Sequence, residues 1–180
     1  PAPVRRPLIA VLGLEALALF LAGAQSAVGL RTDEAKYLLD IPYPHPPLLR
    51  GLMHLTEALP FQETLWRVLL ATAFVQAVWL VADLGRTLPH ARRMALCALW
   101  LLSGGMLLQA GSLLLAPVNG LQGLVFVWLL SRPELVRRHA PLVAAFWLAS
   151  VLTGYQAVLF GPLVLAAFLR SGIPLLPSLA

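Results

Sequence analysis

In this chain of 180 residues, 59% of the residues are hydrophobic and 12% are charged, whereas about a quarter are charged in a typical soluble domain. This composition excludes an ordinary soluble domain and indicates a membrane protein. The formal net charge is +5, but the arginines are scattered between apolar runs, as orientation in a membrane requires, and we expect no nucleic-acid partner. Because spans of about 20 residues leave no room for a separate soluble domain, residues 1–180 are expected to form one all-α, polytopic bundle.

The first apolar run covers residues 8–29 and follows Arg5 and Arg6. A basic start before an apolar run is also typical of a signal peptide. This run, however, exceeds the roughly 7–15 residues of a signal core, and no small-residue cleavage site separates it from a polar domain. We therefore expect a retained transmembrane helix. Because the sequence opens on Pro1 and not on Met, its start is expected to be processed or incomplete.

Residues 30–63 are mixed in polarity and rich in proline, which breaks long helices. We expect an outer loop here, with one or two short interfacial helices. Further apolar runs follow, and the last of them is interrupted by glycine and proline, which favours two short helices over one tilted span. About six transmembrane segments are therefore predicted, and they cover residues 8–29, 65–84, 94–115, 119–131 and, as a pair, 141–169.

The basic residues indicate the orientation of these segments, because Lys and Arg collect on the cytoplasmic side of a membrane. With the N-terminus inside, most arginines fall on that side, whereas Arg31, Lys36, Arg50 and Arg67 fall outside. We therefore expect a multi-pass protein of a bacterial-type inner membrane, with a cytoplasmic N-terminus. The loop at residues 30–63 then faces the periplasm, and any catalysis would take place there.

This loop carries the strongest candidate for a site. Asp33 and Glu34 are adjacent, so their side chains diverge by about 100° on a helix and cannot share one proton as a dyad. One carboxylate can act as a general base on an acceptor hydroxyl or amine, while the other holds a metal or orients a basic residue. Positive charge that can bind a phosphate or pyrophosphate is supplied by Arg31, Lys36, His45 and Arg50. The alternative is a solvated loop whose charges only keep it in water.

The order of these motifs resembles the GT-C membrane glycosyltransferases, which use lipid-phosphate sugars and include protein O-mannosyltransferases and the aminoarabinose transferases of lipid A. The likeness rests on Asp33-Glu34 and Tyr37 after a first helix, followed by Pro46-Pro47-Leu48. It covers roughly residues 8–170, which correspond to the N-terminal half of these enzymes. The resemblance therefore implies either a piece of a longer enzyme or a shortened descendant.

The resemblance also implies roles for individual residues. Asp33 would be the catalytic base that activates the acceptor, and Glu34 would shape or coordinate the site. His45 would lie near the donor phosphate. The full substrate-binding set would be Glu34, Tyr37, His45, Arg31 and Lys36.

A divalent metal is a candidate cofactor of such a site. In the relatives, an acidic residue usually stands in the turn before the fourth helix, where this sequence has Asn119. The amide can coordinate through its oxygen but brings no charge to offset that of a metal. Glu34 and Asn119 are therefore the candidate ligands.

Three functions from different classes fit these features. The first is an inverting glycosyltransferase that moves a sugar from a polyprenyl-phosphate donor, or another lipid, to an acceptor at the outer membrane face. The second is a shortened, non-catalytic subunit that packs against other membrane proteins in a larger complex. The third is a small transporter, which would depend on Glu15 inside the first span. The transporter is disfavoured because the sequence has no inverted repeat.

Overall fold

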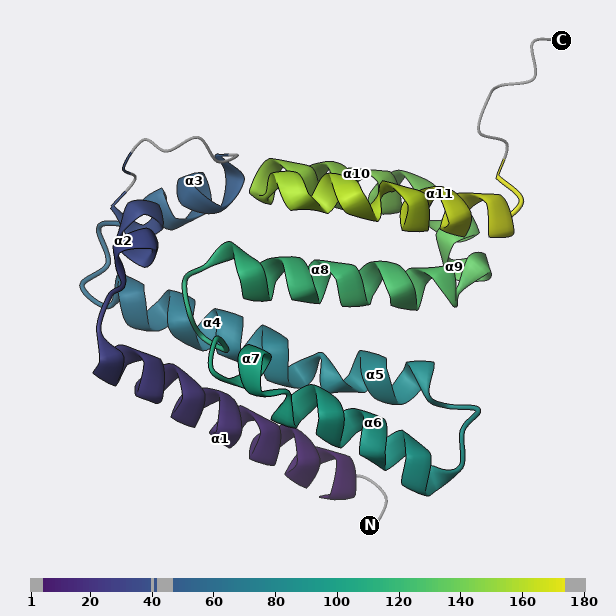
Figure 1. The fold of residues 1–180 in the computed structure, drawn as a ribbon, viewed down its shortest axis with the longest axis horizontal. Helices are drawn as coiled ribbons and strands as arrows, with labels where there is room; N and C mark the ends of the chain where they lie inside the picture. The colour runs from purple at the N-terminus through teal and green to yellow at the C-terminus, as the bar shows by residue number, and fades with distance from the viewer. Residues whose placement is uncertain (1–4, 40, 42–46, 174–180) are drawn as a thin grey trace, which may run out of the picture.

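The computed structural model describes residues 5–39, 41 and 47–173, and every regular element in these ranges is a helix (Figure 1). The predicted all-α class is therefore confirmed. The long helices lie roughly side by side, so that their ends gather at the two ends of a bundle (Figure 1). His45, expected near a donor phosphate, lies outside the described residues.

Among the described residues, two helices are long and apolar enough to cross a membrane. One lies in α1 (Arg5–Val28), where 22 residues with a mean hydropathy of 2.1 extend over about 33 Å. The other has 23 residues with a mean hydropathy of 1.8 and consists of α4 (Gln62–Gln76) and α5 (Val78–Leu84). Both exceed the roughly 30 Å of a hydrocarbon core. The other apolar helices among the described residues are shorter, so two of the six predicted spans have full membrane-crossing length.

Small side chains allow α1 to pack closely along α4. Ala18 and Ala22 of α1 and Ala71 of α4 are buried in one cluster with Phe74, and small residues at a helix contact let two backbones approach. Glu15, an acidic residue in the apolar part of α1, accepts a hydrogen bond of 2.7 Å from the hydroxyl of a threonine on α4. Glu15 therefore takes part in a hydrogen bond between α1 and α4.

Two short helices follow α1 within the stretch expected to be a loop: α2 (Thr32–Leu38) and α3 (Leu48–His54). Leu38 of α2 and Met53 of α3 are buried in a cluster with Leu113, which lies far along the chain. This apolar contact holds both short helices against one end of the bundle, which we call the α2 end (Figure 1).

The helix expected over residues 94–115 ends early. α6 (His90–Leu102) stops at an extended residue, and only the single turn of α7 (Gly104–Leu107) follows. The chain then turns at Gly111, whose φ of +79° is a left-handed conformation that favours glycine. A Cβ atom there would lie 3.2 Å from the carbonyl oxygen of Arg67. The missing side chain therefore lets this segment pack against α4.

The next helix, α8 (Leu115–Leu130), starts before the turn expected around Pro117 and hence before the span predicted over residues 119–131. Pro117 lies in the first turn of α8, where backbone N–H groups have no acceptor within the helix. Its missing N–H therefore breaks no hydrogen bond there.

The last third of the chain folds back over α8. Phe126 of α8 is buried together with Val143 and Val164, which come from two different later helices. The stretch 141–169 is divided at Gly154, where the backbone is extended. The elements are α9 (Pro133–Arg138), α10 (Ala140–Thr153), the 3₁₀ helix η1 (Tyr155–Phe160) and α11 (Gly161–Arg170).

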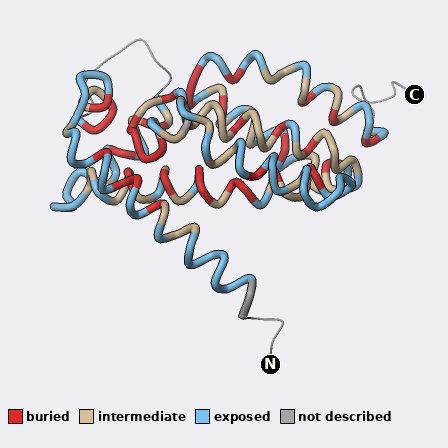
Figure 2. The backbone as a smooth tube through the Cα atoms, turned by 60° about the horizontal axis from the view of Figure 1, so that its bottom comes forward, coloured by how far each residue is buried: buried red, intermediate tan, exposed pale blue. Residues whose placement is uncertain are grey.

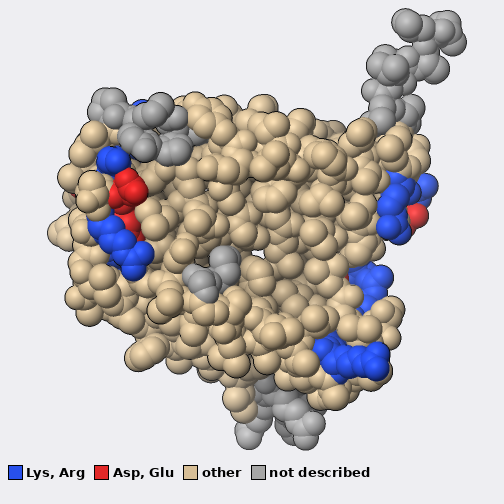
Figure 3. Space-filling view, in the orientation of Figure 1, with Lys and Arg blue, Asp and Glu red and all other residues tan. Residues whose placement is uncertain are grey.

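Charged side chains on the face drawn in Figure 3 lie at the two ends of the bundle, with an uncharged band between them. The end opposite the α2 end, which we call the α9 end, carries the arginines of α9. Figure 2 shows that the first half of α1 is largely exposed, and its exposed side chains include Leu8, Ile9 and Leu12. This distribution places apolar surface between two polar ends, as the bilayer requires of the proteins that cross it.

Candidate functional site

A buried ion pair joins α2 to the N-terminal part of α4. The Nη1 atom of Arg67 donates to Oε1 of Glu34 over 3.0 Å, and Nη2 donates to Oε2 over 3.3 Å. Both residues have 0% of their surface exposed. This two-pronged geometry is the strongest form of an arginine–carboxylate contact.

The remaining donors of Arg67 are also used. Nε donates to Oε1 of Glu63 one turn earlier on α4, at 2.8 Å. Nη1 also donates to the carbonyl oxygen of Gly111 at 3.2 Å, and Nη2 to that of Gly29 at 3.4 Å. All five N–H groups of the guanidinium therefore have acceptors. One side chain connects the end of α1, the start of α2, α4 and the turn before α8.

Glu34 is equally well satisfied. Besides the two bonds from Arg67, its Oε1 accepts the backbone N–H of Leu113 at 2.9 Å, and its Oε2 accepts that of Arg31 at 2.9 Å. Burial favours the neutral acid, but the bonds from Arg67, Arg31 and Leu113 and the charge of Arg67 outweigh it, so the pKa of Glu34 lies below its usual range. Glu34 is an ionised structural anchor.

The same hydrogen bonds decide whether Glu34 can be the metal ligand expected from the sequence. A carboxylate offers about four lone-pair directions, and Glu34 uses one for each of the four bonds just described. Within the described part of the chain, no group of three or more His, Cys, Asp or Glu side chains is placed to hold a metal ion. The carboxylate of Glu34, with all four directions taken by N–H donors, therefore does not fit the role of a metal ligand.

Asp33 has the opposite environment from its neighbour. Its side chain is 65% exposed, and its Oδ1 atom accepts a hydrogen bond of 2.8 Å from Nζ of Lys36 one turn later on α2. Asp33, Lys36 and Tyr37 line a cavity of about 250 Å³, which is completed by the start of α8 and by Gln156 of η1. The two adjacent carboxylates are thus directed apart, as their spacing on a helix requires.

Asn119, the second candidate metal ligand, does not line this cavity itself. Its Nδ2 atom donates to Oε1 of Gln156 at 3.4 Å, and Gln156 reaches the cavity. The Oδ1 atom of Asn119 is buried, and no hydrogen-bond donor faces it among the described residues. Asn119 therefore supports the wall of the cavity and keeps one free acceptor.

An apolar groove lies next to this region, between α3 and α10. It has a volume of about 340 Å³ and is lined by Pro47, Leu48, Leu52 and Leu152, among others. Leu152 of the groove and Gln156 of the cavity lie on either side of the extended residue Gly154, so the groove and the polar cavity flank the same junction between α10 and η1.

The structure brings together part of the set expected from the sequence. Asp33, Lys36 and Tyr37 share the cavity, whereas Arg31 turns toward α1, where its Nη2 atom lies 3.5 Å from Oε1 of Gln25. Arg67 was missed, although an arginine within an apolar run is costly and signals a buried partner. Gln156 carried no comparable signal, because a glutamine in a short polar break has many plain explanations.

These features define an all-α protein with two helices able to cross a membrane and a polar cavity at one end of the bundle. Comparison of the chain with known protein families, curated proteins and solved structures finds no match in any of the three.

Proposed function

We propose that this chain is a multi-pass membrane protein of the GT-C glycosyltransferase type, which transfers a sugar from a polyprenyl-phosphate donor at the outer membrane face. Asp33 is the base. It takes the proton of the acceptor group while the acceptor atom bonds to the sugar carbon with inversion, and the polyprenyl phosphate leaves with the electrons of the broken bond.

The observation that carries this proposal is that two adjacent carboxylates have different environments: Glu34 is buried and paired, whereas Asp33 lines the cavity. Glu34 is held inside by Arg67, which fixes the rotation of α2 and directs Asp33 to the cavity. Lys36, 2.8 Å from Asp33, keeps a positive charge at the same cavity. A cation at this position can offset the charge of a leaving phosphate.

The neighbouring groove supports a lipid-linked donor. Its lining is almost entirely aliphatic and includes Leu48, Leu52 and Leu152. Apolar walls of this kind exclude water from a hydrocarbon chain, while the cavity beside them offers polar groups for a sugar phosphate. A donor with a polar head and an isoprenoid tail matches both surfaces.

The proposed topology has six crossings, with the N-terminus in the cytoplasm and the α2 end in the periplasm. It is supported by the return of the chain to the α2 end at Gly29, Gly111 and Gln156, since the first two contact Arg67 and the third lines the Asp33 cavity. The turns around Arg86 and Arg132 meet in one pocket at the α9 end. The basic end is then cytoplasmic, in agreement with the positive-inside tendency.

The test compares Asp33→Asn with the unmodified protein in membranes supplied with radiolabelled polyprenyl-phosphate sugars. Transfer should fall by about a hundredfold or more, since a general base contributes 10²–10⁴. Glu57→Gln is the matched control, because Glu57 is an exposed acid of the same loop that pairs with His54 and does not line the cavity. Equal transfer by Asp33→Asn and Glu57→Gln would exclude Asp33 as the base.

A second candidate function, a non-catalytic subunit of a larger membrane complex, is favoured by the surface of α1. Only 17% of its membrane-length stretch is buried within the chain, and exposed side chains such as Leu12 and Phe20 leave room for helices of a partner. This candidate requires stable co-purification with other membrane proteins that Asp33→Asn leaves unchanged.

A further inference from the structure

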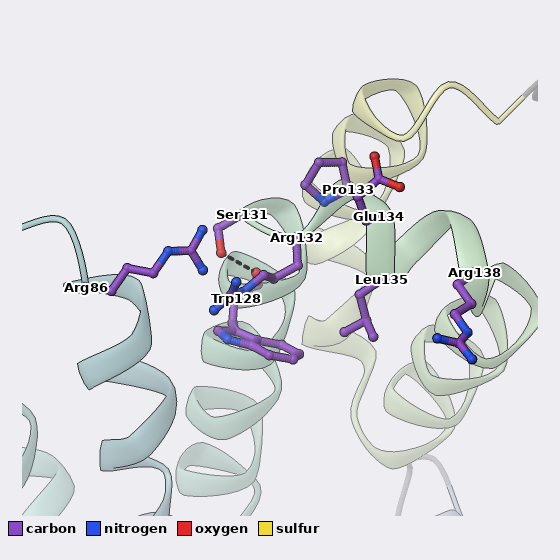
Figure 4. A pocket seen from close by; sticks show the side chains of 8 residues that line it. All are labelled: Arg86, Trp128, Ser131, Arg132, Pro133, Glu134, Leu135 and Arg138. Carbon is purple, nitrogen blue, oxygen red and sulfur yellow. Dashed lines mark hydrogen bonds between the residues drawn. The ribbon is translucent and has the colours of Figure 1, made fainter.

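A second pocket lies at the α9 end, remote in the fold from the Asp33 cavity. It has a volume of about 530 Å³ and receives Arg86 from the turn after α5, Arg132 from the turn after α8 and Arg138 from the end of α9. Figure 4 shows Arg86 extending toward Ser131 and Arg132, with Arg138 on the other side of Leu135. Three elements therefore contribute one arginine each to a single pocket.

The acids near this pocket do not neutralise it. Asp83 is shared, since it accepts a hydrogen bond from Arg132 and lies 3.7 Å from Nη1 of Arg86. Glu134 pairs with Arg137. Arg138 makes no ion pair or hydrogen bond with any residue in the described part of the chain, so the pocket keeps an excess of positive charge.

Arg132 also has an unused donor. Its guanidinium stands 5.9 Å from the centre of the Trp128 ring, and Trp128 itself donates to Oδ2 of Asp83 at 2.7 Å. The Nε atom of Arg132 is buried and, within the described residues, has no acceptor. A buried N–H without an acceptor is costly, which indicates an acceptor outside the described residues.

We propose that this basic pocket binds a phosphate group, carried either by the headgroup of an anionic phospholipid or by a free phosphate ester. Phosphate suits the site because its several oxygens can accept hydrogen bonds from more than one guanidinium N–H group at once. The proposal depends on none of the residues assigned to sugar transfer.

Two features favour the lipid as the source. Leu135 and the ring of Trp128 form an apolar wall beside the arginines, and an indole ring next to a polar group is typical of the membrane interface. Basic pockets between membrane helices on the cytoplasmic side are places where anionic headgroups bind, and the α9 end is the cytoplasmic end of the proposed topology.

The test is calorimetric titration of the full chain in a non-ionic detergent with three probes: dihexanoyl phosphatidylglycerol, its zwitterionic phosphatidylcholine counterpart, and inorganic phosphate. The informative variant is Arg86→Gln with Arg138→Gln, because both side chains are exposed and Arg132 stays in place to hold Asp83. The matched control is Arg92→Gln with Arg93→Gln, which removes the same charge from α6 and leaves the pocket lining intact. Thermal unfolding verifies that both variants fold.

We expect the pocket variant to bind phosphatidylglycerol about tenfold or more weakly, since each arginine near a headgroup contributes several-fold, and the control to bind within about twofold of the unmodified protein. Binding of phosphatidylglycerol without binding of inorganic phosphate identifies the lipid as the source. Binding of inorganic phosphate with equal strength identifies a free phosphate ester. Equal losses in the two variants, or no binding of any probe, would overturn the proposal.

Discussion

Arg67 and Glu34, separated by 33 positions in the sequence, form a bidentate ion pair in which neither side chain is exposed. The pair fixes α2 against α4 at the α2 end of the bundle. Because adjacent side chains diverge by about 100° on a helix, the inward direction of Glu34 sets the outward direction of Asp33. The orientation of the proposed base therefore depends on a residue that is not itself in the cavity.

Removing one partner of this pair should destabilise the fold strongly. Glu34→Gln removes the buried partner of Arg67 and leaves only the partly exposed carboxylate of Glu63 to offset its charge, and the free energy of unfolding should fall by about 3 kcal/mol. Replacing both partners, as Glu34→Leu with Arg67→Met, should restore much of this loss, because no buried charge remains. Reversible unfolding in mixed micelles gives the free energy of unfolding of the unmodified protein, of Glu34→Gln and of the double variant. A single variant as stable as the unmodified protein would contradict the role of the pair.

The pair also gives stability a defined pH dependence. The pKa of Glu34 is lowered in the fold from a reference of 4.5, so between the two values the unfolded chain binds a proton that the folded chain does not. The stability contributed by Glu34 is therefore complete above about pH 4.5 and is lost as the pH falls through the folded pKa. The difference in stability between the unmodified protein and Glu34→Gln, measured by thermal unfolding, should shrink with acidification. It should stay constant between about pH 6 and about pH 8, which lie roughly 1.5 and 3.5 units above the reference.

Gly111 should tolerate no side chain. Its φ is +79°, and a Cβ atom would lie 3.2 Å from the carbonyl oxygen of Arg67. Gly111→Ala should cost about 1–3 kcal/mol of unfolding free energy, since it adds both backbone strain and crowding. Gly51→Ala is the matched control, because Gly51 lies inside α3 with open space around its Cβ position, and alanine favours a helix. Equal effects at the two positions would show that the turn at Gly111 is not tightly packed.

The proposed topology can be tested by cysteine labelling of intact cells. Cys97 is buried and is first replaced by alanine. Glu57→Cys lies on an exposed part of the loop that the proposed topology places in the periplasm, and Thr87→Cys lies in the exposed turn after α5. A membrane-impermeant maleimide should label position 57 in intact cells and position 87 only after lysis. The reverse pattern would invert the orientation, and equal labelling of both positions would argue against a membrane barrier between the two ends.

Composition and periodicity were sufficient for the helical class, because apolar runs of this length have few other solutions. They were also sufficient for the divergence of Asp33 and Glu34, which follows from helix geometry. The early end of α6 was not predictable from hydropathy, since the segment up to Leu115 stays apolar while its backbone turns at Gly111.

The contacts of the site were hard to predict from the sequence because they join residues that are distant in it. Glu34 was expected to shape or coordinate the site, whereas its carboxylate is fully used by Arg67, Arg31 and Leu113. Only the arrangement of the turn before α8 brings Leu113 to it, and nothing in the spacing of the sequence encodes that contact. Arg67 could have been found by asking what neutralises an arginine in an apolar helix.

The most direct test of this account measures sugar transfer and the free energy of unfolding side by side for Asp33→Asn and Glu34→Gln. Asp33→Asn should lose transfer with little change in stability, because its pair with Lys36 is largely exposed. Glu34→Gln should lose stability first, and any transfer it retains should scale with the folded fraction. Full transfer by a folded Asp33→Asn protein would contradict the assignment of the two carboxylates.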